Sequence, residues 1–436
     1  MTSPDTAPRT TRVGATLFAL FLANTLSWGD RALLGVVVDP IKRDLLLSDT
    51  QMSLLSGAIF IAFNLIAGVA ISHWVDRGNR KLILLVGVAV WSFATALIGA
   101  ATGFASLAIA LILVGVGEAT VFPVALSMIG DLRAPAERPR AVAMFQAGTF
   151  VGLVGGSILA GVLAAAHGWR WMFVVCGASG VVLLVAMMIA VRDPVRRADD
   201  TAMDALPADG DARGAIRRVL ATPGFVPLSL GIGFLGTVGA VLGAWGPAFL
   251  QRSHHVPLAE VGAVIGPAVG ISGIAGTIIG GVLATMLVRR RNSERAGLLV
   301  PLIATPIATP FLILFVFAPT LGGAMAATAI MTFLISLGVA PCFALGSGVV
   351  GHRVRALAST LMLFAFGLIG SGMGPFVVGV VSDALEPGYG IESLRYALAT
   401  MIVTPAIATL LLLLAYRRLG DVVPRAMGPA AAAAIH

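Results

Sequence analysis

Long hydrophobic runs dominate the chain, and short polar segments separate them. Twelve runs reach about 20 residues, the length at which an α-helix crosses the apolar core of a bilayer. They cover residues 13–38, 51–75, 82–101, 104–130, 141–166, 171–191, 224–250, 257–288, 297–318, 321–350, 356–382 and 393–416. None alternates polar and apolar positions as a strand of a membrane barrel does. The pattern therefore predicts an all-α membrane protein with twelve transmembrane helices.

The composition narrows the class of protein further. Of the 436 residues, 58% are apolar and 11% are charged, whereas about 25% of residues are charged in an average soluble domain. This excludes an ordinary soluble protein, a disordered chain and a nucleic-acid-binding module. The two cysteines, Cys176 and Cys342, lie inside apolar runs without metal-ligand spacing. We expect no metal site, no cofactor and, since a P-loop and a serine-nucleophile turn are both missing, no enzyme activity.

Lysine and arginine concentrate in every second loop. If the N-terminus lies inside, the inner segments hold 23 of the 29 basic residues and the outer loops hold five, while Arg31 lies within a span. The positive-inside rule then places both termini in the cytoplasm. The basic loops account for the net charge of +8 without a nucleic-acid partner. With the arginine-rich and alanine-rich composition, this predicts a multi-pass protein of the bacterial inner membrane.

The longest inner segment divides the twelve spans into two sets of six. It covers residues 192–222 and carries both acidic and basic side chains. The predicted parts are an N-terminal tail (1–12), a first bundle (13–191), this linker, a second bundle (223–416) and a C-terminal tail (417–436). Two six-helix bundles joined by a cytoplasmic linker are typical of secondary transporters that alternate access to a central site.

Three charged residues lie well inside the predicted spans: Asp30 and Arg31 in the first and Glu118 in the fourth. Ionisable groups at such depth are costly and usually line a cavity or an ion pathway. At about 1.5 Å per residue, Asp30 lies about 13 Å and Glu118 about 18 Å below the outer surface. We predict that the three bind substrate and couple its movement to protons. A static ion pair that fixes helix packing is the alternative.

Uncharged polar residues differ between the two bundles. The first bundle offers Asn24, Asn64 and Gln146 within spans, whereas the second offers Trp245, a few serines and threonines and many phenylalanines. These four residues are candidates for lining a cavity with one charged wall and one apolar wall. Such a cavity suits a small amphipathic substrate that has a polar or anionic head and an apolar body.

The loop between the second and third spans reads SHWVDRGNRK at 72–81. It resembles the loop G-x-x-x-D-R-x-G-R-[RK] of the major facilitator superfamily, with both glycines replaced. Asp76, Arg77, Arg80 and Lys81 match the charged positions of that motif. In the family this loop holds the two bundles together on the cytoplasmic side. The resemblance therefore implies a cytoplasmic latch made of these four residues.

Further segments within residues 20–195 resemble the Spinster-like branch of that superfamily. They read NTLSWGDRALLGVVVDPIKRD at 24–44, LSDTQMSLLSG at 47–57, GVGEA at 115–119 and GWRW at 168–171. The resemblance implies transport of lysolipids, sphingoid lipids and related amphipathic molecules. It also implies that Asp30, Arg31 and Glu118 take part in substrate binding and proton coupling. Relatives usually carry an arginine where this chain has Leu111, so Arg31 is expected to be the sole cation of the cavity.

Two alternatives remain from the sequence. The sugar-acid branch shares a similar Asp-Arg pair in its first helix, which leaves open a proton symporter of sugar acids or other organic anions. A membrane sensor that resembles a transporter but carries no flux belongs to a different class. We favour an amphipathic substrate, because a sugar acid is polar on all sides. We expect the protein to act as a monomer, with a small substrate, protons and the bilayer as its partners.

Overall fold

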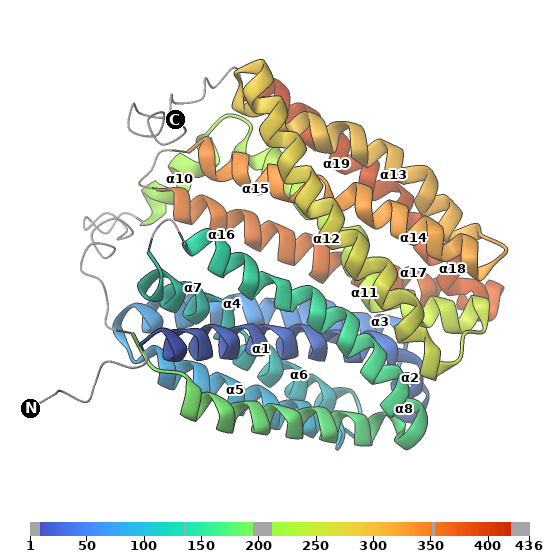
Figure 1. Ribbon diagram of the computed structural model, residues 1–436. Coiled ribbons are helices and arrows are strands. Elements are labelled where there is room, and N and C mark those ends of the chain that lie inside the picture. Colours follow the sequence, from blue (N-terminus) through green and yellow to red (C-terminus); the bar gives the residue numbers. More distant parts are fainter. Residues whose placement is uncertain (1–8, 135–136, 195–211, 351–353, 420–436) are drawn as a thin grey trace, which may run out of the picture.

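The computed structural model describes residues 9–134, 137–194, 212–350 and 354–419, and all regular elements in these ranges are helices (Figure 1). The first bundle contains α1 (Arg9–Val36), α2 (Val38–Leu45), α3 (Asp49–Ser53), η1 (Leu54–Ile59), α4 (Phe60–Arg77), α5 (Arg80–Ile98), α6 (Phe104–Glu118), α7 (Val121–Leu132) and α8 (Arg138–Ala190). Because α3, η1 and α4 follow one another without a gap, they form one continuous crossing. Only Ala119 and Thr120 separate α6 from α7, and these two helices also form one crossing.

The second bundle follows the same plan after a short helix, α10 (Ala212–Ala221). It contains α11 (Phe225–His254), α12 (Leu258–Arg291), η2 (Glu294–Leu298), α13 (Leu299–Phe317), α14 (Leu321–Ser336), α15 (Val339–Gly348), α16 (Arg355–Ala365), η4 (Phe366–Met373), α17 (Gly374–Tyr389), η5 (Gly390–Glu392), α18 (Ser393–Ala399), η6 (Thr400–Ile402) and α19 (Val403–Arg418). Most of the two predicted tails and of the predicted linker lies outside the described residues.

The number of membrane crossings agrees with the hydrophobic pattern. Nine stretches of the described residues are long and apolar enough to cross a membrane. Gly168 (φ 83°) divides one of them, Arg140–Ala190, and Gly390 (φ 53°) divides another, Leu357–Arg418. A glycine adopts this left-handed conformation easily, which lets each pair of helices reverse direction. With the 28 residues of α1, twelve crossings result within the described ranges, and the predicted fold class is confirmed.

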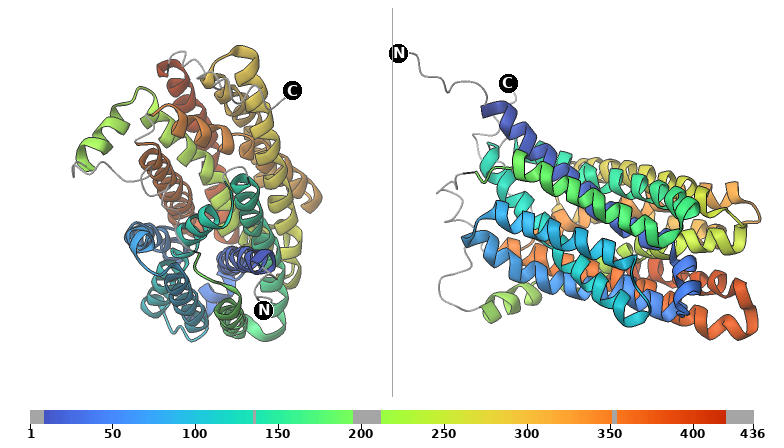
Figure 2. Two further views of the ribbon diagram at one scale, coloured as in Figure 1. Left: turned by 60° about the vertical axis from the view of Figure 1, so that its left-hand side comes forward. Right: turned by 90° about the horizontal axis from the view of Figure 1, so that it is seen from below.

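The two bundles lie side by side, and contacts between α8 and α12 and between α1 and α11 join them. In Figure 1, α1 to α8 form the blue-to-green bundle, and α11 to α19 form the yellow-to-red bundle. The left view of Figure 2 shows them as two groups in contact. We call the end at which α1 begins and α19 finishes the terminal end, and the end at which α2 and the turn between α11 and α12 lie the far end. The start of α1 and the end of α19 both lie on the left of Figure 1.

Glycine allows close contact between the bundles. A Cβ atom on Gly35 of α1 would lie 2.1 Å from the carbonyl oxygen of Gly243 in α11, and one on Gly262 of α12 would lie 1.8 Å from that of Ser157 in α8. Small residues of this kind let membrane helices approach until their backbones touch. Glycines of α1, α11 and α12 therefore lie at the contact surfaces between the two bundles.

The same principle operates inside the first bundle and yields a prediction. A Cβ on Gly152 would lie 2.0 Å from the carbonyl oxygen of Thr25 in α1, whereas one on Gly155, less than a turn away in α8, meets nothing within 4 Å. We expect Gly152→Ala to lower stability by about 1–3 kcal/mol, the usual cost of overpacking. Gly155→Ala is the matched control and should be neutral or slightly stabilising, because alanine favours a helix. Thermal unfolding of the purified variants measures both, and equal effects would contradict the close contact.

Candidate functional site

A cavity of about 360 Å³ lies between the two bundles. Its volume falls within the range of about 300–1,000 Å³ that is usual for small-molecule sites. The first bundle contributes residues of α1, α2, η1, α4, α5, α6 and α8 to the lining, and the second contributes residues of α11, α12, α14, α15, η4 and α17. Because both bundles supply its walls, any motion of one bundle against the other changes the shape of this cavity.

An ion pair lies in the wall formed by the first bundle. Arg31 Nε of α1 donates to Glu118 Oε2 of α6 at 2.8 Å. The Glu118 side chain is fully buried, and the Arg31 side chain is 28% exposed. The guanidinium carbon of Arg31 also lies 4.9 Å from the ring centroids of Trp28 and Phe60. Both rings can stabilise the cation through their faces, so Arg31 is held by one charge and two aromatic rings.

The cavity carries one more acid than base. Asp30 accepts a hydrogen bond from Thr95 Oγ1 at 3.0 Å. Within the described residues it has no cationic partner of its own. The Oε1 atom of Glu118 is buried and has no hydrogen-bond partner among the described residues. Asp30, Arg31 and Glu118 are the charged lining residues, so with all three ionised the wall has a net charge of −1, which a proton or an organic cation neutralises.

The four uncharged cavity candidates lie outside the lining. Asn24 donates to the Phe145 carbonyl at 2.8 Å, and Asn64 donates to the Gly115 carbonyl at 2.8 Å. Trp245 is buried, and its Nε1 donates to the Pro375 carbonyl at 3.1 Å. Gln146 is exposed. Three of the four thus use their polar groups to bond one helix to another, while Leu111, at the position of the missing arginine, does line the cavity.

The predicted latch residues that the structure describes contact the first bundle. Arg80 is 2% exposed, and its Nε lies 2.7 Å from Asp193 Oδ1, just beyond α8. It also pairs with Asp131 of α7. Lys81 Nζ donates to the Met188 carbonyl at 2.7 Å. The side chains of Asp76 and Arg77 lie outside the described residues, so a role of the four residues in holding the two bundles together stays a prediction.

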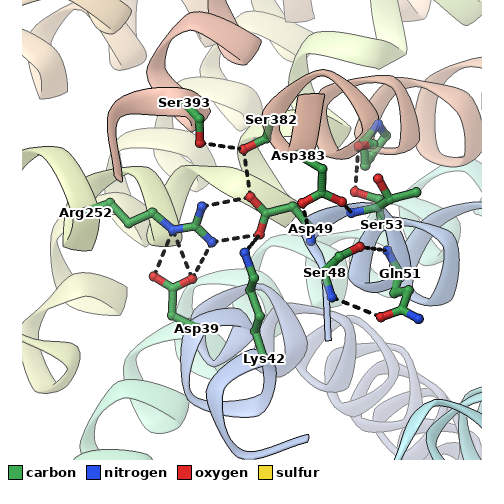
Figure 3. Close-up of polar contacts among 12 residues, drawn as sticks. Asp39, Lys42, Ser48, Asp49, Gln51, Ser53, Arg252, Ser382, Asp383 and Ser393 are labelled. Atoms are coloured by element: carbon green, nitrogen blue, oxygen red, sulfur yellow. Dashed lines mark hydrogen bonds and ion pairs between the residues drawn. The ribbon is translucent and has the colours of Figure 1, made fainter. Parts of the chain in front are cut away.

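A cluster of charges joins the two bundles at the far end (Figure 3). Arg252, near the end of α11, bonds two carboxylates of the first bundle. Its Nε lies 3.0 Å from Asp39 Oδ1, and its Nη1 lies 2.9 Å from Asp49 Oδ2. Lys42 Nζ approaches Asp49 Oδ1 to 2.8 Å. The guanidinium group therefore forms a bridge between α11 on one side and α2 and α3 on the other.

The second bundle also caps a helix of the first. The Asp383 carboxylate of α17 accepts hydrogen bonds from the backbone N–H groups of Asp49 (2.9 Å) and Thr50 (2.7 Å), in the first turn of α3. Ser382 donates to Asp49 Oδ2 at 2.7 Å. Carboxylates stabilise a helix N-terminus because the first N–H groups of a helix lack partners within it. We call these six residues the far-end cluster: Asp39, Lys42, Asp49, Arg252, Ser382 and Asp383.

Sequence reasoning missed the far-end cluster. From the sequence, Lys42 and Arg252 are only two of the five basic residues in the predicted outer loops. The only available signal was that acidic and basic residues are scarce in the outer loops, so that those present are expected to pair with one another. Which loops meet could not be inferred, because Arg252 is more than 200 positions from its partners.

The central ion pair leads to a stability prediction. Arg31→Met leaves the Glu118 carboxylate buried without its cation, and breaking a buried pair in this way costs about 3–5 kcal/mol. We expect a loss near the lower limit, because Arg31 is 28% exposed. The double variant Arg31→Met/Glu118→Met removes both charges and should regain most of the lost stability in thermal unfolding. A double variant no more stable than Arg31→Met would contradict the pairing.

The far-end cluster leads to a prediction about conformation. Spin labels at Thr102→Cys and Ile391→Cys, in a chain without its two native cysteines, report the distance between the bundles at the far end. Arg252→Met should lengthen and broaden that distance distribution, because the bridge between α11 and the two carboxylates is lost. Arg43→Met is the matched control, since Arg43 is an exposed residue of α2 outside the cluster. Identical distributions in both variants would exclude a bridging role.

Known proteins resemble the chain over almost its whole length. Residues 20–375 match the family model of the Major Facilitator Superfamily. The chain is 32% identical over 397 residues to the MFS-type efflux pump of Mycolicibacterium smegmatis, which covers 90% of this chain and 89% of that protein. It is 28% identical over 404 residues to Protein spinster homolog 1 of Xenopus laevis, covering 87% and 76% of the two chains.

Solved structures give the same result. A bacterial homolog of the human lysosomal transporter Spinster, in an inward-facing and unoccupied conformation, is 27% identical and superposes with a TM-score of 0.82, covering 94% of this chain and 98% of that one. A D-xylose–proton symporter shares the fold at 15% identity, with a TM-score of 0.72 and the same coverage. Both the motifs and the superposition point to one branch of one family. The chain belongs to the Major Facilitator Superfamily, and within it to the Spinster branch.

Proposed function

We propose that the chain is a proton-coupled secondary transporter that moves an amphipathic molecule by alternating access. One observation supports this above the others: a cavity between two bundles in which every charge lies on one wall and the other wall is largely apolar. An apolar body fits the second wall, and a polar head fits the first. The rigid parts of this motion are residues 13–191 and 223–416, which move against each other around the central site.

The excess of acid over base in the cavity narrows the proposed substrate. With Arg31 already paired to Glu118, Asp30 is the carboxylate that a positive group can reach. A lysolipid or sphingoid-type amphiphile with an ammonium group satisfies that carboxylate and fills the apolar part of the cavity. A free organic anion must instead compete with Glu118 for Arg31, so a sugar-acid symporter remains the second candidate.

Competition between protons and substrate provides the coupling in this proposal. Protonation of Asp30 or Glu118 brings the charge of the wall from −1 to zero and weakens its attraction for an ammonium group. Deprotonation restores the attraction. The energy of a proton gradient can in this way drive the release of substrate on the acidic side, since only a ligand that binds two states differently shifts their equilibrium.

The orientation and the conformation belong to the same proposal. We place the protein in the bacterial inner membrane as a monomer, with the terminal end and both termini in the cytoplasm, because the basic residues concentrate there. The far-end cluster then closes the outer side, and the cavity communicates with the cytoplasm. In the opposite state Asp76, Arg77, Arg80 and Lys81 would hold the cytoplasmic ends of the bundles together.

Flux through proteoliposomes tests the proposed function. Under an imposed proton gradient, wild-type protein should move radiolabelled lysophosphatidylcholine, and Asp30→Asn and Glu118→Gln should each reduce that flux at least about tenfold, a change worth 1.4 kcal/mol. Asp44→Asn is the matched control, because Asp44 pairs with Arg170 away from the cavity and should leave flux unchanged.

Each other outcome of this experiment has a defined meaning. Wild-type flux in both cavity variants would contradict the coupling role of Asp30 and Glu118. Flux inhibited by uronates but not by lysolipids would favour the sugar-acid symporter. Folded protein that moves neither class of molecule would favour a membrane sensor without flux.

A further inference from the structure

The wall that the second bundle contributes to the cavity carries hydroxyl groups that form no hydrogen bond with the residues the structure describes. In the wall of the first bundle, each hydroxyl has a partner: that of Ser56 donates to the Met52 carbonyl at 2.9 Å, and that of Thr95 donates to Asp30. Thr149 Oγ1 accepts from Asn24 at 3.0 Å. In the second wall, the structure gives no hydrogen bond within its described ranges for three hydroxyl-bearing lining residues, Thr332, Ser336 and Ser371.

Thr332 of α14 is the most informative of the three. It is 7% exposed, and its Oγ1 is buried without a hydrogen-bond partner among the described residues. Threonine in an apolar helix usually bonds back to the carbonyl four residues earlier. Thr328, one turn away in α14, does so with the Ala324 carbonyl at 2.9 Å, and Thr277 in α12 does so at 2.8 Å. Thr332 lacks that bond, which leaves its hydroxyl for another partner.

Gly273 of α12 keeps a space open beside these hydroxyls. A Cβ atom there would lie 3.4 Å from Phe150 Cε1 of α8, 3.8 Å from Ser336 Oγ and 3.9 Å from Thr332 Cγ2. These are ordinary contact distances, so a methyl group would fit between α12, α14 and Phe150 and would occupy that space. We call the space bounded by Gly273, Thr332 and Ser336 the α14 niche.

We propose that the α14 niche binds a hydroxyl or carbonyl group on the apolar part of the substrate. This inference rests on the proposed function, because it assumes that the charged head lies at the opposite wall beside Asp30 and Glu118. A hydroxyl side chain can both donate and accept, so it pairs with either kind of group. The substrate class is then an amphiphile with a second polar group remote from its head, and a simple alkyl chain leaves the Thr332 hydroxyl unsatisfied.

A pair of probes that differ in one hydroxyl tests the niche. Dodecyltrimethylammonium and its 12-hydroxydodecyl analogue are titrated against purified protein, with tryptophan fluorescence as the readout, since Trp28 lines the cavity. Wild-type protein should bind the hydroxylated probe about tenfold more tightly, near the upper limit for one net hydrogen bond. Thr332→Val, which keeps the shape of the side chain, should bring the ratio close to one. Thr328→Val is the matched control and should preserve it.

Two further measurements separate recognition from a structural role. Gly273→Ala fills the niche and should weaken the binding of the hydroxylated probe more than the binding of the unsubstituted probe. Thr332→Val removes an unpartnered buried hydroxyl, so its unfolding temperature should rise above that of the wild type, whereas Thr328→Val loses a satisfied bond and should not stabilise the protein.

The outcomes distinguish this inference from the proposed function. If both probes bind wild-type protein equally well, or if Thr332→Val lowers both affinities alike, the proposed role of the niche is overturned. Binding of a cationic amphiphile then still supports the proposed function. If neither probe binds to wild-type protein, the proposed ammonium-bearing substrate is overturned, and the niche with it.

Discussion

The bridge from Arg252 to Asp39 and Asp49 is the contact on which the arrangement of the two bundles depends. Glycine contacts such as that of Gly35 let the helices approach, and van der Waals packing then holds them together. A guanidinium group that bonds two carboxylates has a fixed geometry. All three side chains are at most 11% exposed, so solvent ions screen them weakly. The bridge thereby restricts how the two bundles can lie relative to each other at the far end.

Charge within the cavity follows a different rule from charge at the far end. At the far end each acidic and basic side chain of the cluster forms an ion pair or several hydrogen bonds, as expected of a structural cluster. In the cavity the Arg31–Glu118 pair leaves Asp30 with one hydroxyl partner and Glu118 Oε1 with none among the described residues. A membrane protein that needed these residues only for packing would gain by completing the pairing or by replacing it with apolar side chains. Incomplete pairing is typical of a site whose missing partner arrives with the substrate.

The sequence predicted the fold and the charged centre, and the reason is the same for both. In a bilayer a run of about 20 apolar residues has one stable structure, the helix, so twelve runs predicted twelve crossings. A charge within such a run is rare enough to be informative by itself, which identified Asp30, Arg31 and Glu118. An uncharged polar residue within a span is less informative. The side chains of Asn24, Asn64 and Trp245 each donate a hydrogen bond to a carbonyl of a neighbouring helix, and nothing in the sequence distinguishes that role from lining a cavity. The far-end cluster was missed for a different reason, because the pairing of charges at the ends of helices depends on the tertiary fold.

The two walls of the cavity show how a largely apolar site can still be selective. Apolar surface discriminates weakly between molecules of similar size, whereas a buried polar group that a wrong ligand leaves unpaired discriminates strongly. The cavity has such groups on both sides: Glu118 Oε1 in the first bundle and Thr332 Oγ1 in the second. Because the two belong to different bundles, a ligand that satisfies both also connects the bundles. Recognition of the substrate and the relative position of the bundles then become one equilibrium, which is the condition for coupling binding to the change of access.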